Sequence, residues 1–152
     1  NAWQAGRVAG KVNLANFIGS PNLRDVTIEL RPPGSTTVLE SFTMRLAQDN
    51  GFSFVTARRG LTDIRFRVPG FCSRVISNVN ITSTSPGNLV TLLPNGDPDQ
   101  SGEVDAVDID LVISNFGAAT TSAVLGDLDG SGEVDAVDID ITIANFGQTG
   151  TP

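Results

Sequence analysis

A segment of 22 residues occurs twice in the last third of the chain, and this repeat constrains the fold more than any other feature. Residues 96–117 read GDPDQSGEVDAVDIDLVISNFG, and residues 126–147 read GDLDGSGEVDAVDIDITIANFG. The copies lie 30 positions apart and are identical at 17 of 22 places. Each begins with closely spaced acidic residues and continues into an apolar stretch long enough for a helix of about three turns. The repeat therefore predicts two similar loop–helix units.

The acidic residues of each copy follow the spacing of a calcium-binding loop. Such a loop places oxygen ligands at positions 1, 3, 5, 7, 9 and 12, and position 7 contributes its backbone carbonyl. The residues expected at these positions are Asp97, Asp99, Ser101, Glu103, Asp105 and Asp108 in the first loop, and Asp127, Asp129, Ser131, Glu133, Asp135 and Asp138 in the second. We therefore expect the chain to bind two Ca²⁺ ions.

Two further positions of each loop support this interpretation. Gly102 and Gly132 occupy position 6, where the loop turns sharply and a Cβ atom would obstruct it. Val104 and Val134 occupy position 8, from which an apolar side chain can join the two loops through a shared core. A chance run of surface aspartates would not match all of these positions in both copies.

The loops differ from an EF-hand in two respects. Position 12 is Asp instead of Glu, and no helical segment precedes the first loop. A calcium loop followed by a helix, without the entering helix, resembles the dockerin family (type I), whose modules bind cohesin domains in extracellular bacterial assemblies. The resemblance covers residues 96–147 and implies that loop positions 10 and 11 and the following helix contact the partner. The partner-binding residues expected from the resemblance and from helical spacing are Ala106, Val107, Leu111, Ala136, Val137 and Ile141.

Each predicted helix carries two apolar stripes. The first stripe has the spacing i, i+3, i+4, i+7 and is expected to form the core between the helices; it consists of Ile109, Val112, Ile113 and Phe116. The second stripe is formed by Val107 and Leu111 and is repeated by Val137 and Ile141. The second stripe could pack within the chain, on the linker or the β domain. Alternatively, it could contact another chain, because a module of about 55 residues has little interior to fill.

The region before the repeats has the alternation of a β-rich domain. Short segments of period two are separated by turns rich in Gly, Pro, Asn and Ser. The expected strands are residues 8–14, 26–30, 42–46, 52–54, 64–68 and 75–81. The fold class predicted is mainly β plus a small α module: an antiparallel, Ig-like β-sandwich over residues 1–93, then the loop–helix pair over residues 94–152.

One face of each expected strand is apolar and should point into the sandwich. These residues are Val12, Leu14, Val26, Ile28, Leu30, Phe42, Phe52, Phe54, Ile64, Phe66 and Val68. Arg65 and Arg67 alternate with the last three and are expected to face solvent. The final residues, QTGTP, are expected to fray.

The β-rich region resembles the Ig-like or transthyretin-like modules of secreted bacterial proteins, such as carboxypeptidase regulatory-like domains. The segments that carry the resemblance are GKVNL (10–14), NGFSF (50–54) and GLTDIRFRVPGF (60–71). It implies a non-catalytic spacer or adhesion domain. Together with the dockerin resemblance, it implies an extracellular location, either secreted or at the cell surface.

Charge is divided unequally between the two regions. All ten basic residues precede residue 75 together with five acids, which gives this part +5, whereas the remainder has twelve acids and no base. Metal ligation explains the acidic part. The arginines form no basic cluster, so nucleic acid is not expected as a partner. No run approaches the ~20 apolar residues of a membrane-spanning helix, so no membrane span is expected.

Two classes of function remain open. The chain could be a structural assembly protein in which the β-sandwich of one copy binds the dockerin-like module of the next, head to tail, giving a filament. Alternatively, it could be the C-terminal docking region of a larger secreted protein that binds a separate cohesin-like receptor. Both hypotheses predict a calcium-dependent protein–protein contact.

An enzyme is not expected. The paired carboxylates lie in the calcium loops, and the single cysteine, Cys72, has apolar neighbours and no histidine to activate it, which predicts a buried, inert thiol. Carbohydrate binding is poorly supported, because the chain has no tyrosine and Trp3 is its sole tryptophan.

Overall fold

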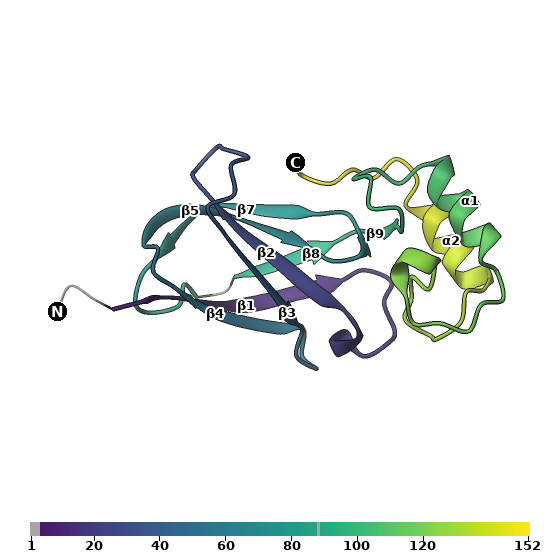
Figure 1. Ribbon diagram of the computed structural model, residues 1–152, viewed down its shortest axis with the longest axis horizontal. Helices are drawn as coiled ribbons and strands as arrows, with labels where there is room; N and C mark the ends of the chain where they lie inside the picture. Colours follow the sequence, from purple (N-terminus) through teal and green to yellow (C-terminus); the bar gives the residue numbers. More distant parts are fainter. Residues whose placement is uncertain (1–3, 88) are drawn as a thin grey trace.

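The computed structural model describes residues 4–87 and 89–152 and combines a β-sandwich with a pair of short helices at one end (Figure 1). Trp3 lies outside the described residues. The strands are β1 (Gly6–Leu14), β2 (Asp25–Arg31), β3 (Glu40–Arg45), β4 (Gly51–Thr56), β5 (Gly60–Arg67), β6 (Gly70–Phe71), β7 (Arg74–Ile81), β8 (Val90–Leu93) and β9 (Asn95–Asp97). The helices are α1 (Ala106–Ser114) and α2 (Ala136–Ala144), with 3-10 turns at Pro21–Leu23 and Ala123–Leu125.

Two sheets form the sandwich. One has the strand order β4-β1-β8 and the other β3-β2-β5-β7, while β6 and β9 form a separate ladder. Among the described residues, all strand pairs but one are antiparallel: β8 runs parallel to β1, with Lys11 opposite Val90 and Leu14 opposite Leu93. The prediction of an entirely antiparallel sandwich was therefore wrong at this edge, because the chain crosses from β7 to the other sheet before forming β8.

The six predicted strands are present, each extended or shifted by a few residues, and three further strands are short. β8 has four residues, β9 three and β6 two. The sequence NGD of β9 is typical of a turn. It becomes a strand because β6 pairs with it, which is a tertiary contact that local pattern does not encode.

The apolar residues divide into two buried clusters. The larger fills the sandwich and includes nine of the eleven residues predicted to point inward, while Leu14 and Phe42 are half-buried against it. The smaller consists of Val112, Leu128, Val134 and Ile141 and lies between the helices and loops. Each part of the chain thus has its own core.

The last residues of the chain lie against the outer face of the four-stranded sheet, in contrast to the predicted fraying (Figure 1). The Thr151 amide donates to the carbonyl of Ser73 at 3.0 Å, and Arg31 Nη1 donates to the carbonyl of Pro152 at 2.8 Å. Arg65 Nε donates to the carbonyl of Thr151 at 3.1 Å. Arg65 was expected to face solvent, and this contact explains why it is half-buried instead.

A buried carboxylate lies beneath this segment. Glu29 is 7% exposed and pairs with Arg31 at 2.8 Å, Arg67 at 3.2 Å and Arg65 at 3.4 Å. Burial acts to raise the pKa of Glu29, but the three guanidinium groups together hold it below its ordinary value. Glu29 therefore holds Arg31 and Arg65 in place, and these two arginines bind the C-terminal segment.

Candidate metal centres

Three carboxylates converge in each loop. Side-chain oxygens of Asp97, Asp99 and Asp108 lie within 4.8 Å of one another, and those of Asp127, Asp129 and Asp138 do the same. We call these groups the first and second triads. Among residues 4–87 and 89–152, they are the two sets of His, Cys, Asp or Glu side chains that could hold a metal ion. Each triad connects the start of its loop to the first turn of the helix that follows.

The backbone of each loop is wrapped around its first carboxylate. Asp97 accepts from the amides of Ser101 and Gly102 at 3.1 and 3.0 Å, and the second loop repeats both bonds at 3.1 and 3.2 Å. This winding requires a positive φ at position 6, and Gly102 and Gly132 have φ values of 93° and 96°. A glycine adopts this conformation without the strain that a Cβ atom would cause.

Positions 5 and 7 also lie together. The Ser101 hydroxyl donates to the carbonyl of Glu103 at 3.1 Å, and Ser131 donates to that of Glu133 at 3.2 Å. The glutamates are exposed and their carboxylates are outside the triads. This arrangement fits the prediction that Glu103 and Glu133 offer their backbone carbonyls.

The residue at position 9 also caps the following helix in both loops. The Asp105 carboxylate accepts from the Val107 amide at 2.8 Å, and the Asp105 amide donates to Asp108 at 2.8 Å. This reciprocal pair is a capping box, and Asp135 forms the same one with Asp138. The structure therefore places Asp105 and Asp135 at the helix starts, beside the triads. A ligand at position 9 often reaches the ion through a water molecule, which such a capping role permits.

Each triad concentrates negative charge on carboxylates that are buried, except for the exposed Asp99. Asp108, Asp127 and Asp138 are fully buried. Burial raises the pKa of Asp97 to about 7, with its neighbour Asp99 as the next cause, and raises the pKa of Asp108 to about 6. Burial likewise raises the pKa values of Asp127 and Asp138. Because the gathered ligands are all oxygens, the site suits a hard divalent cation such as Ca²⁺.

The structure brings only some of the predicted partner-binding residues to the surface. Ala106, Val107, Ala136 and Val137 are exposed, and Leu111 is half-buried. Ile141 is 6% exposed and belongs to the smaller core, so its assignment to a partner surface was wrong. Ile141 is buried because α2 packs this side chain against the loop residues of the same core.

The first apolar stripe is also only partly internal. Val112 is buried and Ile109 half-buried, as predicted, but Ile113 and Phe116 are 53% and 57% exposed. Val104 and Val134, projecting from the loops, are fully buried. Val134 belongs to the smaller core, so a loop residue fills part of the interior that the stripe was expected to fill.

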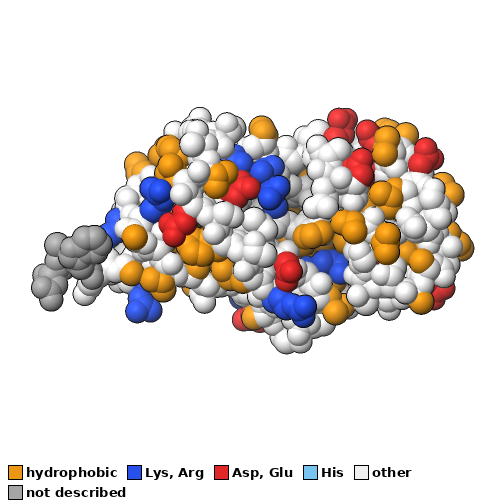
Figure 2. Space-filling view, viewed as in Figure 1, with side chains coloured by type: hydrophobic (Ala, Val, Ile, Leu, Met, Phe, Trp, Pro, Cys, Tyr) orange, Lys and Arg blue, Asp and Glu red, His pale blue; other side chains and the backbone are white. Residues whose placement is uncertain are grey.

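The outer surface of each helix has a regular composition that the stripe analysis missed. In α1 the exposed residues Val107, Asp110 and Ile113 recur at every third position, and α2 repeats them as Val137, Asp140 and Ile143. We call these six residues the helical face. Figure 2 shows hydrophobic and acidic side chains next to one another at this end of the molecule. The sequence contains this pattern as an apolar residue, an acidic residue and an apolar residue at intervals of three positions.

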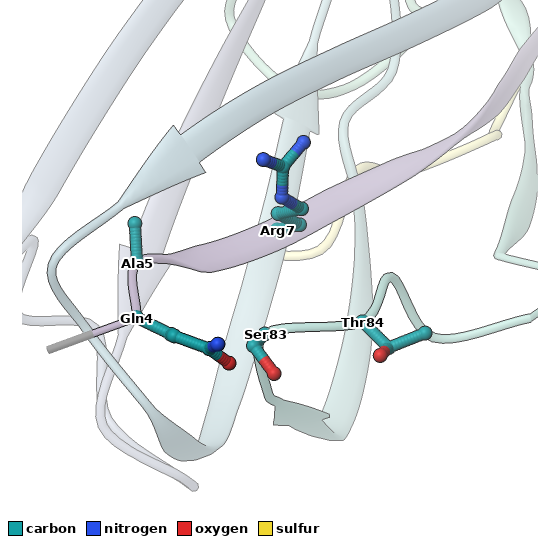
Figure 3. Close-up of a pocket in the computed structure, with 5 residues that line it drawn as sticks. All are labelled: Gln4, Ala5, Arg7, Ser83 and Thr84. Atoms are coloured by element: carbon teal, nitrogen blue, oxygen red, sulfur yellow. The ribbon is translucent and has the colours of Figure 1, made fainter. Parts of the chain in front are cut away.

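Two other features do not resemble catalytic sites. A pocket at the opposite end of the sandwich is lined by Gln4, Ala5, Arg7, Ser83 and Thr84 (Figure 3), a set that supplies hydroxyl, amide and guanidinium groups but no carboxylate pair. Cys72 is fully buried, as predicted, and burial raises its thiol pKa to about 11. A protonated, enclosed thiol is a poor nucleophile. In the part of the chain that the structure describes, no helix is long and apolar enough to span a membrane.

The comparisons with known proteins identify related folds but no family. No protein-family model matches the chain, and no curated protein sequence matches it either. Among the solved structures that match, two have a TM-score of 0.68, at 22% and 20% identity. Each match covers 94% of this chain and 96% of the matched chain. Both are type II cohesin–X-dockerin complexes from Acetivibrio cellulolyticus, one mutated at the N-terminal and one at the C-terminal interface. Because the match covers 94% of this chain, it includes most of the sandwich and most of the loop–helix repeats.

Proposed function

We propose that this chain is a non-catalytic, calcium-dependent docking module of an extracellular protein assembly, and that it binds a cohesin-like domain. The observation that carries the proposal is the direct connection between each triad and the helical face. Asp108 and Asp138 lie in the triads and also close the capping boxes of α1 and α2. The similarity in fold to cohesin–X-dockerin complexes supports the choice of partner.

In this proposal the loops organise the helices. Asp97, Asp99 and Asp108 would hold one Ca²⁺ in the first loop, together with the Ser101 hydroxyl and the Glu103 carbonyl, and Asp105 would contribute through water. The second loop would use the corresponding residues. Bound Ca²⁺ would neutralise the buried carboxylates, and binding to an incompletely formed loop contributes directly to folding. The orientation of each helix thus depends on its loop.

The helical face has the composition of a contact surface. Val107, Ile113, Val137 and Ile143 are 56%, 53%, 48% and 56% exposed. Asp110 and Asp140 lie between them along the helices and are exposed. Apolar side chains supply the burial that stabilises a complex, while a central acid selects partners that offer a basic or hydrogen-bonding group. The proposed partner therefore presents an apolar surface with a complementary donor.

Titration of the purified chain with type I and type II cohesin domains tests the proposal. We expect binding to at least one of them in excess Ca²⁺ and none in chelator. Val107→Glu combined with Val137→Glu should eliminate this binding and leave the calcium stoichiometry at two, whereas Thr43→Glu on the distant strand β3 should change neither. A chain that binds none of the cohesins, or binds them equally well in chelator, would overturn the proposal.

Self-assembly is a second candidate function, favoured by the separation of charge. The sandwich carries all ten basic residues and the repeats carry twelve of the seventeen acids. In addition, Val90 and Leu92 on the edge strand β8 are 52% and 58% exposed. A contact between the helical face of one copy and a sandwich of the next would propagate into a filament if it does not close.

Light scattering and negative-stain microscopy of the chain alone distinguish the two candidates. Polymers that form with Ca²⁺ and dissolve in chelator would establish self-assembly. A monomer under both conditions would exclude self-assembly and leave docking to a separate receptor.

A further inference from the structure

The two loops are nearly identical in sequence but differ in their surroundings. Asp129 in the second loop is 3% exposed, whereas its counterpart Asp99 in the first loop is exposed. The second loop lies against the sandwich at the turn between β1 and β2. The first loop has no equivalent cover over this position.

The sandwich holds the backbone of the second loop through hydrogen bonds. The amides of Ile18 and Gly19 donate to the carbonyl of Asp129 at 2.8 and 3.1 Å. Arg24 Nη2 donates to the carbonyl of Asp127 at 2.6 Å, and its Nη1 donates to the carbonyl of Thr121 at 2.6 Å. Asn95 Nδ2 donates to the carbonyl of Leu128 at 2.8 Å. Three consecutive loop carbonyls are thereby fixed by groups outside the loop.

One of the five differences between the repeats follows from this contact, and a second follows from the second loop itself. Gly130 replaces Gln100, and a Cβ atom at Gly130 would lie 2.4 Å from the ring of Phe17. Leu128 replaces Pro98; its side chain is fully buried, and its amide donates to Asp138 at 2.7 Å, a bond that proline cannot make. Gly130 is therefore the residue of the second copy that the contact with the sandwich requires.

We propose that the turn between β1 and β2 positions the second calcium loop, so that the two calcium sites are unequal and only the second is coupled to this turn. This inference rests on the proposed calcium sites. Coupling between calcium binding and this contact is reciprocal: if the contact strengthens calcium binding at the second loop, bound Ca²⁺ strengthens the contact by the same factor. A variant that disrupts the contact should therefore lose this part of the calcium affinity. The first loop should bind calcium independently of this contact.

Gly19 provides a steric means of disturbing the contact without changing a charge or a ligand. A Cβ atom at Gly19 would lie 2.5 Å from the carbonyl oxygen of Gly130, and the φ of Gly19 is outside the left-handed region that disfavours alanine. Arg24 is less suitable, because its positive charge also acts on Asp127 and Asp129. Gly87→Ala is the matched control, since a Cβ there meets no atom of the described residues within 4 Å.

The experiment is calorimetric titration of the full chain with Ca²⁺ in two backgrounds. Asp108→Ala leaves the second site, and Asp138→Ala leaves the first. We expect Gly19→Ala to weaken the second site about tenfold, within the usual range of coupling between sites. The first site should change by less than about twofold, and Gly87→Ala should affect neither.

The outcomes separate this inference from the calcium proposal on which it rests. Absence of calcium binding in both parent backgrounds would overturn the calcium sites themselves. Two intact sites that Gly19→Ala leaves unchanged, or weakens equally, would overturn the coupling alone. If Gly19→Ala does not fold, Gly130→Gln serves instead. Its control is Gln100→Gly, because Gln100 already adopts a φ of 60° in the first loop.

Discussion

The charge state of individual aspartates governs how the loops respond to pH. The pKa values of Asp97 and Asp108 are raised to about 7 and about 6, compared with about 3.9 in an unfolded chain. Without a cation, the folded state therefore binds protons more tightly than the unfolded state. The contribution of these groups to stability is complete below pH ~4 and is lost as the pH rises through 6 to 7.

We predict that calcium-free protein becomes less stable as the pH rises from 5 to 8, and that excess Ca²⁺ reverses this dependence. Ca²⁺ replaces the protons that screen the triads, and it binds best when the carboxylates are ionised. The thermal midpoint followed by circular dichroism, in buffers freed of divalent ions, is the measurement. A calcium-free midpoint that increases over this interval would contradict the prediction.

Individual ligands should differ in importance. Asp108→Ala and Asp138→Ala should each remove one site, because position 12 connects the ion to the helix. Ser101→Ala should lower affinity less, since water can replace a neutral hydroxyl. Glu103→Gln is the matched control and should leave both sites intact, because only its carbonyl is required. The number of calcium ions bound by each variant, measured by calorimetry, checks these expectations. A site lost in Glu103→Gln would show that the ligand assignment is wrong.

At the scale of elements, each helix is short and depends on its N-terminal cap. α1 and α2 have nine residues each, a length that is marginal without tertiary support. The Asp105 carboxylate satisfies the Val107 amide, which would otherwise lack an intrahelical partner. The cap is formed by protein atoms alone, from Asp105, Asp108 and backbone amides.

Asp105→Ala should therefore lower the free energy of unfolding by about 1 kcal/mol even in chelator. Asp105→Asn should be close to neutral there, because asparagine caps a helix as well as aspartate does. Chemical denaturation of both variants, with and without Ca²⁺, is the measurement. Equal losses from the two variants in chelator would contradict a capping role.

The spacing of residues predicted the elements better than it predicted their faces. Period-two alternation located the six longer strands, and the loop positions located both triads and both helix starts. Helical spacing could not decide which stripe is buried, because the loop residues Leu128 and Val134 complete the core in which Val112 and Ile141 lie. This is why Ile141 lies in the core and Ile113 lies outside it.

At the scale of the whole molecule, contacts between distant segments order parts of the chain that local sequence describes poorly. The C-terminal segment, residues 148–152, has the composition of a flexible tail. It is ordered by Arg31, Arg65 and Ser73, and by the first loop, where the Gly150 amide donates to the carbonyl of Gly102 at 2.7 Å. These partners lie far away in the sequence, so no local pattern could predict the contact.

Removal of residues 148–152 should expose Cys72, whose thiol lies 3.9 Å from the Gln148 carbonyl. We expect its reaction with a thiol reagent in native buffer to become about tenfold faster, since local opening would no longer require release of the segment. Cys72 is the sole cysteine, so the absorbance change of a chromogenic thiol reagent reports the reaction of this one residue. Denatured protein gives the upper limit of the rate, and an unchanged native rate would show that other elements enclose the thiol.

The parallel pairing of β1 with β8 has a mechanical consequence. β1 is the first strand of the sandwich, and β8 leads through β9 into the first loop. If the helices are held by a partner while the chain before β1 is pulled, the tension acts on opposite ends of these two neighbouring strands. Their hydrogen bonds are then loaded together in shear instead of being opened one at a time. This geometry would let the chain bear load along its length without separating the sheet.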